Sequence, residues 1–189
     1  MSWYHEFLNL NYPEQKQSKT PKKCKQKPPV QGQLKLNVDG AFMPNETEGG
    51  VGGILRNDQG LSVAAFTKHI SGISLAKQVE LEAIRTGPQW LQKYGFPNCI
   101  IETDCQVAVA ELQIQEYLSL EHSNIIDDIH QLLANLNTVS ISFAPRTANA
   151  VAHRLASEAF ESVGFVHWMD VIPVMLRDAL QLDCEHITQ

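Results

Sequence analysis

Two aspartates follow predicted β-strands in a way that could place their carboxylates together. Asp39 ends the alternating pattern of "LKLNVD", and Asp104 ends the short apolar run of "CIIETD". The first run is typical of a strand with one buried face, and the second of a central parallel strand buried on both faces. Open α/β sheets place their ligands at the carboxyl ends of the strands. If these two strands are neighbours, we expect two carboxylates at one edge of the sheet.

A third acid, Glu80, lies on a helix predicted for residues 75–94. One face of this helix is an apolar stripe that includes Glu80, whereas Glu82 lies on the polar face beside Arg85. A carboxylate on a core-facing stripe is costly unless it is paired or bound to a metal ion. A divalent cation would keep such clustered carboxylates ionised. The stripe consists of Ala76, Ala83, Ile84, Gly87 and Leu91.

The last predicted helix begins at Asn149 and has His153 at the margin of its apolar stripe. Taken one at a time, these polar residues also have structural interpretations. Asp39 could form a turn before Gly40, and Asp104 and Asn149 could each be a helix N-cap. A marginal histidine is often just half-buried. A functional site therefore depends on the residues coming together.

The predicted elements indicate one mixed α/β domain over residues 34–163, in the order β-β-β-α-β-α-α-β-α. Pro88 lies inside the first helix, where it removes a hydrogen bond and should kink or end it. We expect strands at 34–38, 49–57, 61–70, 98–104 and 138–145, and helices at 75–94, 106–117, 123–136 and 149–160.

The two ends of the chain differ from this domain. Residues 1–33 have six lysines and two glutamates, a balance of +4, so the remainder must have −10 to give the net charge of −6. We expect residues 1–33 to form a disordered basic arm, either a solvated linker or a segment that contacts phosphates or directs nuclear localisation. Residues 164–189 are expected to be a C-terminal extension.

The composition and the cysteine spacing indicate in which compartment the protein is expected. The sequence has no apolar stretch of the roughly 18 residues that a membrane span needs, and no signal-peptide pattern at its start. The four cysteines are scattered without a C-x-x-C pair, which fits free thiols in a reducing compartment. We expect an intracellular protein of the nucleus or cytoplasm, monomeric and not bound to a membrane.

Five motifs in order resemble the type 1 ribonuclease H domain, in the reverse-transcriptase-like branch of plant genomes and non-LTR retrotransposons. The resemblance covers about residues 34–163. It implies a five-stranded mixed sheet of order 3-2-1-4-5 flanked by helices. It also implies an RNA/DNA hybrid as partner, and fusion or association with a reverse transcriptase. The motifs are "KLNVDGAF", "GGVGGILRNDQG", "VELEAI", "IIETD" and "RTANAVAHRLA".

The resemblance implies cleavage of the RNA strand of RNA/DNA hybrids with two divalent ions, Mg²⁺ or Mn²⁺. The family's typical aspartate in the last helix is replaced here by His153. Because imidazole suits Mn²⁺ better than Mg²⁺, we expect relatively better activity with Mn²⁺. By motif match, the catalytic and metal-binding residues are Asp39, Glu80, Asp104 and His153, and the residues that contact nucleic acid are Gly40, Arg56, Arg146 and Asn149.

Some features of the sequence bear on other functions. A domesticated domain that binds nucleic acid or protein without cutting is the main alternative, because the acidic body suits a polyanionic substrate poorly. The sequence also lacks a basic protrusion between Asp104 and Thr138 and a histidine in "FAPRTAN". A proofreading exonuclease is disfavoured by Ala41, where a second acid would be needed. A transposase or integrase is disfavoured because its glutamate would follow both aspartates.

Overall fold

A six-stranded mixed sheet is the centre of the fold in the computed structural model, which describes residues 26–114, 122–136, 138–170, 173–176 and 178–180. The strand order is β5-β4-β1-β2-β3-β6. The strands are β1 (Leu34–Met43), β2 (Glu48–Arg56), β3 (Ser62–Ser71), β4 (Cys99–Thr103), β5 (Val139–Phe143) and β6 (Phe165–Met169). The α-helices are α2 (Ala76–Tyr94), α3 (Gln106–Gln113), α4 (Ser123–Asn135) and α5 (Ala150–Glu158).

The order 3-2-1-4-5 predicted from the sequence is confirmed, with one strand more than expected. β1, β2 and β3 form an antiparallel meander, while β4 and β5 continue the sheet in parallel beyond β1. β6 adds a sixth strand, antiparallel to β3. Since β6 lies within residues 164–189, part of the expected C-terminal extension belongs to the sheet.

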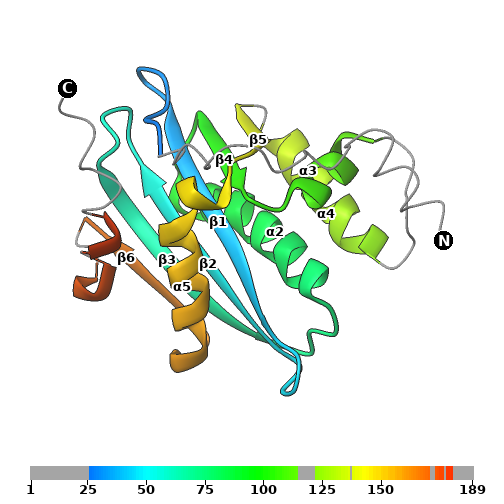
Figure 1. The fold of residues 1–189 in the computed structure, drawn as a ribbon. Helices are drawn as coiled ribbons and strands as arrows, with labels where there is room; N and C mark the ends of the chain where they lie inside the picture. The colour runs from blue at the N-terminus through cyan, green and yellow to red at the C-terminus, as the bar shows by residue number, and fades with distance from the viewer. Residues whose placement is uncertain (1–25, 115–121, 137, 171–172, 177, 181–189) are drawn as a thin grey trace, which may run out of the picture.

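The two faces of the sheet are covered by different helices (Figure 1). Leu36 and Val38 of β1 face α2, and they lie so close to Gly87 that a Cβ there would be 3.3–3.5 Å from their side chains. Helices α2, α3 and α4 share the large core with this face, whereas α5 packs on the other face against Ile54 and Ala65. The main core therefore lies between the sheet and α2.

Close contact between α5 and β2 depends on glycines. A Cβ on Gly52 would overlap the backbone nitrogen of Ala156, and a Cβ on Gly50 would overlap the carbonyl oxygen of the same residue. Without side chains at these two positions, the helix can lie directly on the strand. The glycines of "GGVGG" thus lie in the strand that was predicted at 49–57, where they allow close packing.

Helix α2 continues through Pro88 to Tyr94, as the predicted range 75–94 has it, so the proline does not end the helix. The burial of α2 differs from its prediction in two ways. Glu82, expected on the polar face, is only 7% exposed because its carboxylate bonds to Arg85. Ala76, expected in the buried stripe, is exposed at the first turn. The other members of the stripe are buried as predicted.

Residues 26–33 of the expected basic arm are attached to the domain, and residues 1–25 lie outside the described part. The carbonyl of Lys27 accepts a hydrogen bond from Lys35 Nζ, and the amide of Gly32 donates to Asp58. Among the helices that the structure describes, none has the length and apolar character to cross a membrane.

Candidate metal centre

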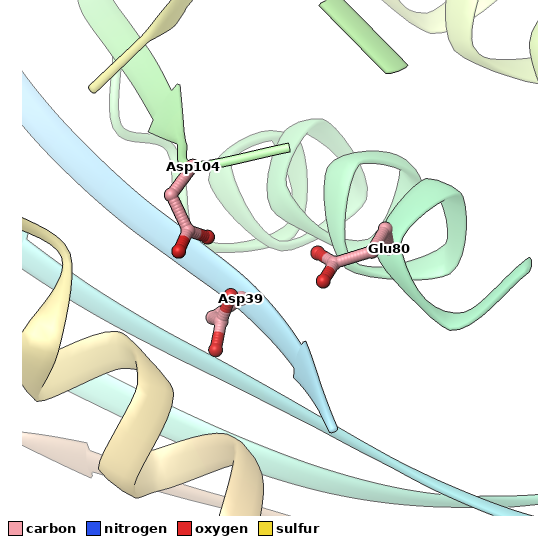
Figure 2. A group of neighbouring side chains, drawn as sticks. All are labelled: Asp39, Glu80 and Asp104. Carbon is pink, nitrogen blue, oxygen red and sulfur yellow. The ribbon is translucent and has the colours of Figure 1, made fainter. Parts of the chain in front are cut away.

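Three carboxylates from distant parts of the chain converge where β4 ends beside β1. Asp39 was expected to end its strand, but β1 continues beyond it to Met43. Asp39 lies on β1, Glu80 in the first half of α2, and Asp104 directly after β4. One oxygen of each carboxylate lies within 4.8 Å of the others. Figure 2 shows the Glu80 side chain pointing from α2 toward the two aspartates. The structure thus brings together the three acids that strand order and helix periodicity selected.

Gly40 explains why Glu80 comes so close to Asp39. A Cβ on Gly40 would lie 2.8–2.9 Å from backbone atoms of Val79 and Glu80, so only glycine lets α2 approach β1 at this point. The Gly40 N–H also donates a hydrogen bond to the Glu80 carboxylate. Gly40 was expected to contact nucleic acid, and the structure gives it a packing role that positions a carboxylate.

Asn149 links three elements of the site. It occupies the N-cap position of α5, but its side chain makes no capping hydrogen bond. Instead, Nδ2 donates to the carbonyl of Val38 at 2.9 Å and to Oδ1 of Asp104 at 3.3 Å. Asn149 therefore occupies the N-cap position as predicted, but its side chain does not cap the helix. The side chain instead holds α5 and Asp104 against β1.

His153 contacts the buried aspartate directly. Its Nδ1 lies 2.7 Å from Oδ2 of Asp39, and its Nε2 lies 3.0 Å from Nη2 of Arg146. Arg146 is 69% exposed, and its Nη1 is 3.9 Å from Asp104 Oδ2, so this outer ion pair is weak. The imidazole thus lies next to the three-carboxylate cluster, in contact with one of its members.

Burial and mutual repulsion make the cluster costly when it is ionised. Burial, a hydrogen bond with Asp104 and the charges of Glu80 and Asp104 raise the pKa of Asp39 to about 9. Burial and then the charge of Asp104 raise the pKa of Glu80 to about 7. The pKa of His153 is lowered by burial first and by Arg146 second. At neutral pH the isolated cluster therefore retains protons that a cation would displace.

The donor set fits a divalent cation such as Mg²⁺ or Mn²⁺. Carboxylate oxygens are the ligands that these hard cations prefer. Oε2 of Glu80 is buried and has no hydrogen-bond partner among the described residues, so a bound cation would satisfy it. A cavity of about 440 Å³ adjoins the cluster, which leaves room for part of a substrate.

Two residues of this cavity were not predicted from the sequence, and one predicted site residue lies elsewhere. Ser157 and Phe160 line it together with His153. The i, i+4 spacing of His153 and Ser157 on α5 could have identified the serine. Arg56 was expected to contact nucleic acid, but it is 2% exposed and its guanidinium donates to Asn37 Oδ1. That burial contradicts a contact between Arg56 and a phosphate.

Known proteins are similar to this chain in sequence and in fold. The family model described as "Reverse transcriptase-like" matches residues 37–159. The Arabidopsis thaliana protein named "Putative ribonuclease H protein At1g65750" is 31% identical over 156 residues, which are 82% of this chain and 25% of that protein. The chain therefore spans about a quarter of the length of this relative.

Two solved structures have a similar fold. RNase H1 of the archaeon Halobacterium salinarum NRC-1 has a TM-score of 0.63 at 24% identity, over 70% of this chain and all of that chain. LC11-RNase H1 in complex with an RNA/DNA hybrid has a TM-score of 0.62 at 18% identity, over 68% of this chain and 97% of that chain. Residues 37–159, which contain all three clustered acids, match the family model. The chain therefore belongs to the reverse transcriptase-like family and has the ribonuclease H fold.

Proposed function

We propose that this chain hydrolyses the RNA strand of RNA/DNA hybrids, using two divalent cations held by Asp39, Glu80 and Asp104. The observation that supports this most directly is the convergence of the three carboxylate oxygens within 4.8 Å beside an open cavity. The name of the Arabidopsis relative and the hybrid bound to LC11-RNase H1 support the choice of substrate.

The protein residues have separable roles in this proposal. When bound, divalent cations activate the attacking water and offset the charge that develops on the phosphate and the leaving oxygen. Asp39 and Glu80, whose pKa values are raised, must give up protons to become ligands. Asn149 holds Asp104 in place through its Nδ2. Because the ligands are fixed by β1, α2 and the end of β4, little reorganisation is needed for binding.

Arg146 and His153 lie where a substrate phosphate would enter. The exposed guanidinium of Arg146 lies 3.9 Å from Asp104, and we assign it to a phosphate of the hybrid. In the structure, Nε2 of His153 accepts a hydrogen bond from Arg146. If the guanidinium moved to that phosphate, Nε2 would become free. That lone pair can then accept a proton from water or coordinate a cation, as the family resemblance implies for this position.

The test is cleavage of an end-labelled RNA/DNA hybrid by the purified chain with Mg²⁺ or Mn²⁺. Asp104→Asn removes one ligand charge while preserving shape, and should abolish cleavage in both metals. Asp58→Asn removes the same charge from a half-buried turn outside the metal centre, where asparagine can still accept the hydrogen bond from the Gly32 amide, and it should cleave like the wild type. Equal cleavage by Asp104→Asn and the wild type would contradict the metal assignment. Hybrid binding without cleavage in either metal would favour a non-cutting domain instead.

A further inference from the structure

A second pocket lies between α2, β3 and β6. Its volume is about 170 Å³, and none of the residues of the metal centre lines it. β6 forms one wall, so this pocket depends on the sixth strand that extends the sheet beyond β3 (Figure 1). The lining residues are Lys68, Thr86, Gln89, Trp90, Lys93 and Phe165.

Two of the residues that line this pocket, both on α2, have a buried polar atom without a hydrogen-bond partner among the described residues. Oγ1 of Thr86 and Nε1 of Trp90 make no hydrogen bond within the described part of the chain, and each residue is only 2% exposed. Their i, i+4 spacing places both side chains on one face of the helix. The indole N–H can only donate, and the threonine hydroxyl can donate. Buried polar groups are rarely unpaired, so an acceptor is missing here.

Two lysines add positive charge at the same place. Lys68 comes from β3 and Lys93 from the last turn of α2. Neither forms an ion pair with any residue that the structure describes, and Lys93 Nζ lies 5.3 Å above the Tyr94 ring. The nearby Glu82 carboxylate is already bonded to Arg85.

Lys68 is also desolvated. Burial lowers the pKa of its ammonium group, while Glu82 raises this pKa and Arg85 lowers it. An anion in the pocket would compensate for the lost hydration of this ammonium group. The wall of this pocket therefore contains two lysine ammonium groups and the unpaired polar atoms of Thr86 and Trp90, and Gln89 adds an amide group.

We propose that this pocket binds an oxyanion of the size of one phosphate group. Its volume exceeds the roughly 30 Å³ of a water molecule but is below the roughly 300 Å³ at which sites for drug-sized ligands begin. The rings of Trp90 and Phe165 exclude water from part of the wall. A free phosphate and a phosphodiester of nucleic acid present the same oxygens to these donors.

The indole N–H of Trp90 is a direct reporter of occupancy. In the ¹⁵N-labelled full chain, with this resonance assigned by its loss in Trp90→Phe, inorganic phosphate should shift it saturably. Chloride at matched ionic strength should not. Lys68→Gln and Lys93→Gln should each weaken phosphate binding about tenfold, since each removes one charge-assisted hydrogen bond. Lys27→Gln, an exposed lysine away from the pocket, should bind like the wild type.

Thr86→Val, which keeps the shape and removes the hydroxyl, should also weaken binding. A response to chloride equal to that to phosphate would overturn the proposal, as would wild-type phosphate affinity in both lysine variants. A short RNA/DNA hybrid in EDTA distinguishes the source of the oxyanion. A hybrid-induced shift that Lys93→Gln abolishes identifies a phosphodiester, and a shift with inorganic phosphate alone identifies a free phosphate. Neither result depends on cleavage, so the hydrolase proposal can fail independently.

Discussion

Nδ1 of His153 donates a hydrogen bond to Oδ2 of Asp39 at 2.7 Å. The contact of the other ring nitrogen, Nε2, shows which of the two atoms is the donor. Nε2 lies 3.0 Å from Nη2 of Arg146, and a guanidinium has donors but no acceptor. Nε2 must therefore have the lone pair, which leaves the proton on Nδ1. The imidazole is neutral, as its lowered pKa also indicates. In this state His153 orients Asp39.

His153→Asp should shift the metal preference toward Mg²⁺. An aspartate offers a hard oxygen ligand where imidazole favours softer ions, so the ratio of kcat/KM with Mg²⁺ to kcat/KM with Mn²⁺ should rise several-fold, to about tenfold. Hybrid cleavage by wild type and variant in both metals measures this ratio. His153→Ala is the matched control, because it removes the imidazole without adding a ligand. A wild type that strongly prefers Mg²⁺ would contradict the expectation.

Asp104→Asn should inactivate the protein and yet stabilise it when no metal is bound. Cleavage should fall by about 100-fold or more, because one ligand charge is lost. The charge of Asp104 raises the pKa values of both Asp39 and Glu80, so its removal relieves repulsion in the metal-free fold. Thermal unfolding in EDTA should show a higher Tm for the variant. A lower Tm would mean that Asp104 contributes a structural contact larger than this repulsion.

The stability of the metal-free protein should fall as pH rises. The folded-state pKa values of Asp39 and Glu80 are raised, from 3.8 to about 9 and from 4.5 to about 7. Between these values the folded state holds more protons than the unfolded state, so the free energy of unfolding decreases with pH. Urea unfolding in EDTA should show a loss of about 1 kcal/mol or more between pH 6 and pH 9.

Asp39→Asn should flatten this pH profile, because it removes the group with the larger shift. Added Mg²⁺ at pH 8 should restore stability to the wild type and release protons, which titration calorimetry in buffers of different ionisation enthalpy detects. A free energy of unfolding that rises with pH for the wild type in EDTA would contradict this prediction. It would show that the carboxylates are already ionised without a cation.

Local patterns in the sequence predicted most of the fold and the three acids. The alternation before Asp39 and the continuous apolar run before Asp104 define two strands by their own residues, and helix periodicity selects Glu80. Adjacency of β1 and β4 then brings Asp39 and Asp104 together, and the packing of α2 on β1 brings Glu80 to them. Each step uses information from within a single element or the order of elements, so a single sequence suffices.

The remaining features depend on partners from other elements. Glu82 bonds to Arg85 of its own helix, and Arg85 also bonds to Asp128 of α4. Arg56 is buried where Asn37 of the neighbouring strand accepts its hydrogen bond. β6 is a five-residue edge strand that pairs with β3, so its own residues give a weak signal. The side chain of Asn149 leaves its helix to bond across to β1. Tertiary contacts decide these features.

Replacing Asn149 should cost both stability and activity. Asn149→Ala leaves the buried Val38 carbonyl without its donor, which should lower the free energy of unfolding by about 1–3 kcal/mol. Asn149→Asp should cost more, because a carboxylate would face that carbonyl and the carboxylate of Asp104. Urea unfolding with hybrid cleavage measures both effects. Equal stability of the two variants would contradict the donor role of Nδ2.

Gly40→Ala should separate the position of Glu80 from the stability of α2. The new Cβ would lie 2.8–2.9 Å from backbone atoms of Val79 and Glu80, so the start of the helix must move and Glu80 with it. Cleavage should fall about tenfold or more, and Mg²⁺ should raise the Tm of the variant less than that of the wild type.

The matched control for Gly40→Ala is Gly95→Ala at the other end of the same helix. Gly95 has a φ of 71°, and a Cβ on it would meet nothing within 4 Å, so the cost there is backbone strain of about 1 kcal/mol without a clash. Gly95→Ala should lower the Tm while leaving the Mg²⁺ response intact. If Gly40→Ala kept the wild-type Mg²⁺ response, close packing of α2 on β1 would not be what places Glu80 in the site.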